Sequence, residues 1–99
     1  MKKVFISHPL SENFVENKKS ADKLLKHLST AYNTILFISP IHLFLFYDYE
    51  TPELRKEILE ICKKLILECD ELWSYGDSKG CVIEENFAKE NYKIVKYFY

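Results

Sequence analysis

The sequence predicts an α/β fold: a small, doubly wound parallel sheet with helices on both faces. A length of 99 residues allows one domain at most. The composition, 47% hydrophobic and 29% charged, is that of an ordinary globular domain and excludes a disordered or low-complexity chain. Short apolar runs alternate with stretches in which apolar residues recur at helical spacing, and this is the pattern of β-α-β units.

The first half of the chain contains two predicted strands with a helix between them. Residues 4–7 form a short apolar run, and residues 33–39 contain a second one. Pro40 ends the second strand, because proline lacks the N–H that a central strand needs. Ser11 is the expected N-cap of a helix over about residues 12–30. The apolar side chains of that helix recur at helical spacing: Phe14, Ala21, Leu24, Leu25 and Leu28.

The second half alternates in the same way. Thr51-Pro52-Glu53 combines a cap, a proline at the first helical position and an acid in the first turn, so a helix is expected from there to about Glu68. Strands are predicted over residues 71–75 and 93–98, with a helix over about residues 81–91 between them. The apolar stripe of the helix after Pro52 is expected to contain Leu54, Ile58, Ile61, Cys62, Leu65 and Cys69.

The simplest order of these four strands is 2-1-3-4, a flavodoxin- or Rossmann-like sheet with right-handed crossovers. The order reverses between the first and third strands, and such sheets bind ligands outside the carboxyl ends of the strands at that point. Two loops are therefore expected to form the binding site. They are residues 7–10 after the first strand and residues 75–81 after the third.

Charge and motifs exclude several classes of function. Fourteen basic and fifteen acidic residues give a net charge of −1, so charge-driven binding to a nucleic-acid polymer is not expected. Neither a G-x-G-x-x-G nor a P-loop follows the first strand, which disfavours a dinucleotide held in the Rossmann manner. The three cysteines are odd in number and form no C-x-x-C, so neither a disulfide framework nor a zinc site is expected. Cys62 and Cys69 are predicted to be buried as small hydrophobic residues.

The chain shows no targeting or membrane signal. Only three apolar residues precede Ser7 and His8 near the start, too few for a signal peptide. The longest apolar stretch, residues 35–47, is broken by polar residues, so no membrane-spanning helix and no membrane partner are expected. We therefore expect a cytoplasmic protein.

Glu84 is the first candidate for chemistry. It lies about one turn into the helix that follows the third strand, at the mouth of the expected cleft. The positive end of that helix is expected to keep its carboxylate ionised, as a glycosyl nucleophile requires. The alternative is an ordinary first-turn acid that complements the helix dipole. The adjacent Glu85 is expected to point elsewhere around the helix.

Two histidines follow strands at the same edge. His8, in the turn before Pro9, either lines the cleft or belongs to a surface turn. His42 follows the second strand and can face the same cleft. The set His8, His42 and Asp48 matches no known ligand spacing, so no metal is expected.

Two residues at helix starts are further candidates. Cys81 is a candidate for a lowered thiol pKa. Arg55 is a candidate for a contact with a phosphate or carboxylate, and the alternative is a solvated first-turn side chain. The sequence has two glycines, and each is expected to occupy a position that requires one.

These motifs resemble the nucleoside 2-deoxyribosyltransferase-like superfamily, and most closely its short phage and bacterial relatives. The resemblance covers nearly the whole chain, as one domain over residues 1–99. It rests on Val4-Phe5-Ile6-Ser7-His8-Pro9-Leu10, Ser39-Pro40-Ile41-His42, Cys69-Asp70-Glu71-Leu72-Trp73 with Gly76-Asp77, and Ser78-x-Gly80-Cys81-x-x-Glu84 with Ala88.

The resemblance implies roles for these residues. Glu84 corresponds to the glutamate that attacks the anomeric carbon, and the loop of residues 7–10 to the wall of the base site. Asp77 is the nearest match to the acid that holds the sugar hydroxyls, with Ser78 standing at the expected offset. No cofactor is implied. The expected substrate-binding residues are Ser7, His8, Pro9, His42, Asp48, Trp73, Gly76, Asp77, Ser78, Gly80 and Cys81.

Three functions stay open at this stage. The first is an enzyme acting on the N-glycosidic bond of a nucleoside or nucleotide, either a deoxyribosyltransferase or an N-glycoside hydrolase. The second is a module that binds, sequesters or senses a nucleotide in the same cleft. The third is an interaction protein that uses the aromatic segment Phe44–Tyr49, because that segment is an exposed apolar patch if nothing covers it.

Two apolar segments of the chain bear on its oligomeric state. Residues 41–49 and the end Tyr97-Phe98-Tyr99 are more apolar than a free loop and a free terminus should be. Either both segments fold back on their own sheet, or they form the interface of a homodimer or a larger closed oligomer. We expect the oligomer, and the resemblance implies the same, because the related transferases complete their sites with a neighbouring subunit.

Overall fold

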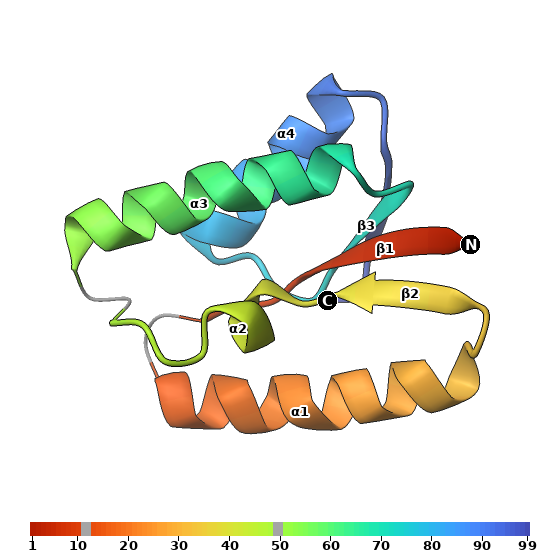
Figure 1. Cartoon of the computed structure of the whole chain (residues 1–99), viewed down its shortest axis with the longest axis horizontal. Coiled ribbons are helices and arrows are strands. Elements are labelled where there is room, and N and C mark those ends of the chain that lie inside the picture. Colours follow the sequence, from red (N-terminus) through yellow and green to blue (C-terminus); the bar gives the residue numbers. More distant parts are fainter. Residues whose placement is uncertain (11–12, 49–50) are drawn as a thin grey trace.

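The computed structural model of the protein describes residues 1–10, 13–48 and 51–99 (Figure 1). No helix within these ranges is both long and apolar enough to cross a membrane. The elements, in chain order, are β1 (Lys2–Ser7), α1 (Phe14–Ala31), β2 (Ile35–Ile38), α2 (Pro40–Leu43), α3 (Pro52–Leu67), β3 (Glu71–Ser74), α4 (Lys79–Glu90) and β4 (Ile94–Tyr97).

The four strands form one parallel sheet in the order β2-β1-β3-β4, which confirms the predicted fold class. The strand order reverses between β1 and β3, where two neighbouring strands lead to loops at the same edge. At that edge Ser7 is in register with Ser74, and both are the last residues of their strands. The two serines therefore lie side by side at the point where such sheets bind ligands.

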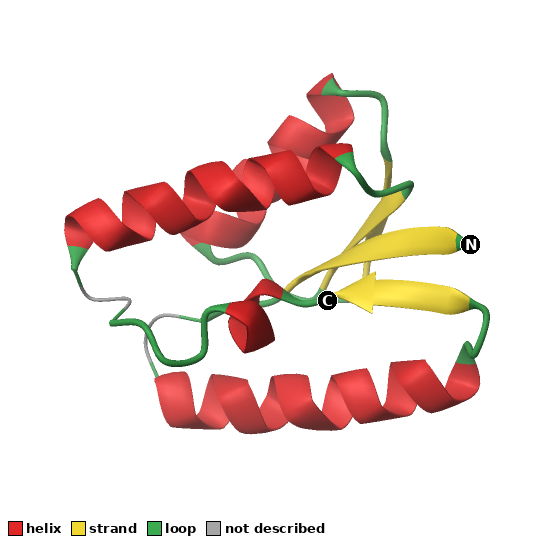
Figure 2. Ribbon diagram, viewed as in Figure 1, coloured by secondary structure: helices red, strands yellow, loops and turns green. Residues whose placement is uncertain are grey.

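Helices cover both faces of the sheet (Figure 2). Successive strand residues point to opposite faces, so β1 contributes Val4 and Ile6 to one core and Phe5 to the other. The first core lies under α1 and contains Val4, Ile6, Leu28 and Trp73. The second lies under α3 and α4 and contains Phe5, Ile58, Cys62, Ile66, Cys69, Leu72 and Ala88.

The predicted helices and strands are confirmed to within a few residues. Thr51 is the N-cap of α3, with Pro52 at the helix start and Glu53 in the first turn. Ser11 lies outside the described residues, and α1 has Asn13 as its N-cap, in a left-handed conformation. Cys62 and Cys69 are free and buried, as predicted.

The predicted stripe of α3 needs one correction. Ile61 is exposed, and Ile66 is buried in its place. Ile58, Cys62 and Ile66 are spaced four apart and share one face, whereas Ile61 is rotated from Cys62 by ~100°.

The segment after β2 is partly folded into the protein. Pro40, expected only to end the strand, also begins the short helix α2, because its fixed φ suits the first helical position. Ile41 is buried and Phe44 packs against the core under α3, whereas Phe46 is 95% exposed. Tyr49, the last aromatic residue of the segment, lies outside the described residues.

The chain's end packs on its own sheet. The ring of Phe98 stacks on that of Tyr75 with centroids 4.9 Å apart and also meets the ring of Trp73. The Tyr99 hydroxyl donates a hydrogen bond to Glu85.

The two loops at the carboxyl edge of β1 and β3 touch at Gly76 and Pro9. A Cβ atom added to Gly76 would lie 2.3 Å from Cγ and 2.7 Å from Cδ of the Pro9 ring. A proline ring cannot swing aside as a flexible side chain can, so Gly76 is required by its neighbour. A Cβ added to Gly80, at the start of α4, would meet nothing within 4 Å, and the expectation that both glycines are required is wrong for Gly80.

This contrast predicts opposite effects of two alanine substitutions. Gly76→Ala should lower the free energy of unfolding by about 1–3 kcal/mol, because the two loops must separate to admit the methyl group. Gly80→Ala should leave it unchanged or raise it by up to about 1 kcal/mol, because alanine favours helix and has room there. Urea unfolding of both variants measures the difference. Equal stabilities of the two variants would contradict the close approach of the loops.

Candidate active site

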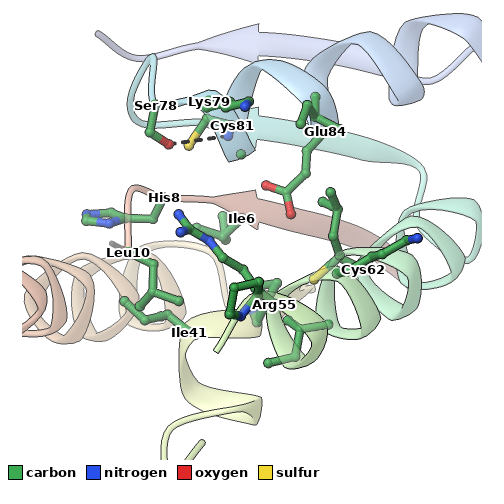
Figure 3. Close-up of a pocket in the computed structure, with 17 residues that line it drawn as sticks. Ile6, His8, Leu10, Ile41, Arg55, Cys62, Ser78, Lys79, Cys81 and Glu84 are labelled. Carbon is green, nitrogen blue, oxygen red and sulfur yellow. Dashed lines mark hydrogen bonds between the residues drawn. The ribbon is translucent and has the colours of Figure 1, made fainter. Parts of the chain in front are cut away.

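A cavity of about 450 Å³ opens at the carboxyl end of β1, between α3 and α4 (Figure 3). Its size is within the range of small-molecule sites. The loop after β1, the start of α2, the first turns of α3 and the first turns of α4 form its walls. The lining residues are Ile6, His8, Leu10, Pro40, Ile41, Pro52, Arg55, Lys56, Ile58, Leu59, Cys62, Ser78, Lys79, Gly80, Cys81, Ile83 and Glu84.

Glu84 is the one carboxylate among these lining residues. Ser78 caps α4 by accepting a hydrogen bond from the backbone N–H of Cys81, 3.3 Å away, and this places Glu84 in the second turn. Its side chain is only 9% exposed. The hydroxyl of Ser7 donates a hydrogen bond of 2.6 Å to Oε1 of Glu84, and the thiol of Cys62 makes a second one from α3.

Burial raises the pKa of Glu84 to about 7. The hydrogen bonds from Ser7 and Cys62 act in the opposite direction, and the charge of Glu85 adds to the increase. The sequence predicted an ionised carboxylate, and this expectation needs correction. Loss of hydration outweighs the two hydrogen bonds, so near neutral pH Glu84 is present in both protonation states.

Glu85 has its own partners. The hydroxyls of Ser74 and Tyr99 donate to its Oε2 atom, the latter at 3.0 Å. It is buried but does not line the cavity. The two adjacent strand ends thus each present one serine to one of two consecutive glutamates, and Glu85 points away from the cavity, as predicted.

His8 lines the cavity on the side of the loop after β1. Its Nδ1 atom lies 2.8 Å from the carbonyl oxygen of Pro9, and its Nε2 atom lies 3.3 Å from the Ser20 hydroxyl. Because a carbonyl oxygen can only accept, Nδ1 carries a proton. In the neutral ring, Nε2 then accepts a hydrogen bond from the Ser20 hydroxyl.

Cys81 lines the cavity, but its thiol is not activated. Burial raises the pKa of Cys81, and the charges of Glu84 and Glu85 raise it further against the hydrogen bonds from Ser7 and Ser78. The expectation of a lowered thiol pKa is therefore wrong. The helix start is too thoroughly desolvated to favour a thiolate.

The structure brings several predicted residues together. Ser78, Gly80 and Cys81 line the cavity with His8 and Glu84, and Ser7 reaches it through its hydrogen bond to Glu84. Pro9 and Gly76 pack on each other behind the wall.

Four predicted residues lie elsewhere. Trp73 faces the core under α1, on the opposite face of the sheet, and its indole N–H donates to Glu71 at 2.9 Å. His42 bridges Ser39 and Asp22 through its two ring nitrogens, at 2.6 and 2.7 Å. The remaining two do not line the cavity: Asp77 is exposed, and Asp48 accepts a hydrogen bond from Thr51.

The walls contain residues that were not among the predicted site residues. Lys56 and Cys62 come from α3, and Lys79 is the first residue of α4. Arg55, considered at the sequence level for an anion contact, also lines the cavity. Helical spacing from Pro52 could have indicated the α3 residues, because that helix begins at the same sheet edge. The apolar stripe of that helix predicts core packing alone, whereas Cys62 also lines the cavity.

Within the described ranges, no group of three or more His, Cys, Asp and Glu side chains lies close enough to hold a metal ion.

The raised pKa of Glu84 predicts a pH dependence of stability. An unfolded glutamate has a pKa near 4.5, so between about pH 4.5 and 7 the folded protein keeps a proton that the unfolded chain has lost. This contribution to stability is fully present at low pH and is lost as the pH rises through about 7. Between pH 5 and 8 it amounts to about 2–3 kcal/mol.

Glu84→Gln should remove that dependence, because the amide is neutral and its oxygen still accepts from Ser7. Urea unfolding at pH 5 and pH 8 tests this. The exposed Glu90 of the same helix supplies the control Glu90→Gln, which should behave like the wild type. A wild-type protein with the same pH dependence as Glu84→Gln would contradict the assignment.

Comparisons with known proteins assign the chain to a family. Residues 2–98 match the profile of a domain of unknown function, DUF7768. None of the curated proteins compared with the chain is detectably similar in sequence. Among solved structures, the 2-deoxyribosyltransferase of the psychrotolerant bacterium Bacillus psychrosaccharolyticus has a similar fold, with a TM-score of 0.68 and 19% sequence identity over 97% of this chain and 71% of that one. Because the family match spans nearly the whole chain, the protein belongs to the DUF7768 family.

Proposed function

We propose that the protein acts on the N-glycosidic bond of a nucleoside or nucleotide, with Glu84 as the nucleophile. The observation that carries the proposal is a single buried carboxylate in the wall of a ligand-sized cavity at the switch point of the sheet. The fold shared with a 2-deoxyribosyltransferase supports the same class of substrate.

The proposed reaction has two steps. An oxygen of ionised Glu84 attacks the anomeric carbon of the sugar, and the bond from that carbon to the base nitrogen breaks. The base leaves with the electron pair and takes up a proton, and the sugar becomes an ester of Glu84. Water or a second base then attacks the same carbon, and the glutamate leaves as carboxylate. Water gives hydrolysis, and a second base gives transfer.

Two neighbours assist these steps. Ser7 donates to Oε1 of Glu84 and holds the carboxylate in place. His8 lines the same cavity, and in its imidazolium form it carries a second proton on Nε2, beside the Ser20 hydroxyl, which it gives to the departing base. Ser7 is a positioning residue in this scheme and His8 a general acid.

Release of free base tests the proposal. The protein is incubated with nucleosides and nucleotides at high enzyme concentration, with and without a second base, and the products are separated by chromatography. Glu84→Gln should lose at least about 10³-fold in rate, because an amide cannot form the ester, while Glu90→Gln keeps the wild-type rate. The wild-type rate should increase as the pH rises through about 7, where Glu84 ionises. Absence of release from every substrate would reject the enzyme.

A binding module that uses the same cavity is the second candidate function. The observation that favours it is the pKa of about 7, since a protonated Glu84 donates a hydrogen bond to a ligand instead of attacking it. Binding of a nucleotide without any product, retained by Glu84→Gln, would identify this function.

We also propose that the protein forms a homodimer or larger closed oligomer through the segment after β2. Leu43, Phe46 and Tyr47 are exposed there, next to Ile41 in the cavity wall, and exposed apolar patches of this kind mark interaction surfaces.

Light scattering at tens of micromolar protein should therefore give at least twice the mass of one chain. Phe46→Asp should shift the mass toward that of the monomer, because a charge on the patch opposes its burial. Val15→Asp, at an exposed apolar residue of α1, is the matched control and should leave the mass unchanged. A wild-type mass of one chain would reject the oligomer.

A further inference from the structure

We propose that Arg55, Lys56 and Lys79 form a phosphate subsite of the cavity, so that its ligand is a nucleoside monophosphate rather than an uncharged nucleoside. The inference rests on the proposed function and narrows its substrate class.

Positive charge predominates in the described part of the cavity wall. Three of its residues are cations, and Glu84 is the one acid among the described lining residues. The whole chain, in contrast, has fourteen basic and fifteen acidic residues. The excess of positive charge among the described lining residues predicts an anionic ligand.

The cations lie at the opening of the cavity, away from Glu84. Arg55 and Lys56 lie near the start of α3, and Lys79 begins α4, so the two helices supply cations to one cavity from separate walls. All three side chains are exposed, whereas Glu84 is buried. In the view of Figure 3 the Arg55 side chain extends between His8 and Glu84. A ligand whose anomeric carbon meets Glu84 inside the cavity thus has cations at its outer end.

The two lysines of the subsite have no acidic partner among the described residues. Neither Lys56 nor Lys79 forms an ion pair with any of the residues that the structure describes. Arginine matches a phosphate with two parallel N–H donors, and lysine adds a point charge. The one strongly anionic group that distinguishes a nucleotide from a nucleoside is its phosphate, so phosphate is the group that these side chains select.

Calorimetric titration tests the subsite. The four common 2′-deoxynucleosides and their 5′-monophosphates are titrated into the wild-type protein and into Arg55→Gln, Lys56→Gln and Lys79→Gln. The control is Lys64→Gln, an exposed lysine in the last turn of α3 that does not line the cavity. We expect a monophosphate to bind at least ~10-fold tighter than its nucleoside. Each cavity variant should weaken the monophosphate by ~10-fold and change nucleoside binding less than ~2-fold, while the control alters neither.

The outcomes separate this inference from the proposed function. Equal affinities for nucleoside and monophosphate, or equal losses in the cavity variants and the control, overturn the subsite and leave the proposed function standing. Absence of binding by every member of both series overturns both. If Arg55→Gln fails to fold, the double variant of Lys56 and Lys79 provides the same comparison. Free-base release from nucleosides with no preference for monophosphates supports the proposed function and rejects the subsite.

Discussion

The hydrogen bond from Ser7 to Glu84 joins the end of the central strand β1 to the second turn of α4, and the candidate site is organised around it. A carboxylate removed from water loses its hydration, and only local donors can replace it. Here the donors are one hydroxyl and one thiol, which offset only part of the loss. The result is a carboxyl group with a pKa of about 7, which gains or loses its proton near neutral pH. Carboxyl groups of this kind are typical of functional sites.

The parallel sheet explains why this group lies where it does. The two central strands both end in serine, in register, and α4 crosses above them with two consecutive glutamates. Each serine meets one glutamate, but the two pairs differ in surroundings. Glu85 is closed off by Ser74 and Tyr99, whereas Glu84 borders a cavity between α3 and α4. One pair thus ties the helix and the chain's end to the sheet, and the other remains accessible to a ligand.

The fold of this protein alone does not identify its reaction. A shared fold at 19% identity shows that the chain has the architecture of a deoxyribosyltransferase, and folds of this type host many activities. Glu84, its donors and the cavity are therefore the features that support the proposed glycosidic chemistry. Cys62 serves both the fold and the site, because it belongs to the core under α3 and also lines the cavity. Its thiol faces a carboxyl group rather than another apolar side chain.

The sequence by itself determined the strand order, the helices α1, α3 and α4, and the edge of the sheet at which the cavity lies, because periodicity, caps and crossover rules are local or topological. It also indicated Glu84 and the loop that carries His8. Only the tertiary structure decided which side chains meet. Trp73 lies on the face of the sheet under α1, away from the cavity, because neighbouring strand residues point to opposite faces. His42 is held away from the cavity by its hydrogen bonds with Ser39 and Asp22. The protonation of Glu84 and Cys81 was likewise decided by burial, which depends on all the elements packed around them and on no single stretch of sequence.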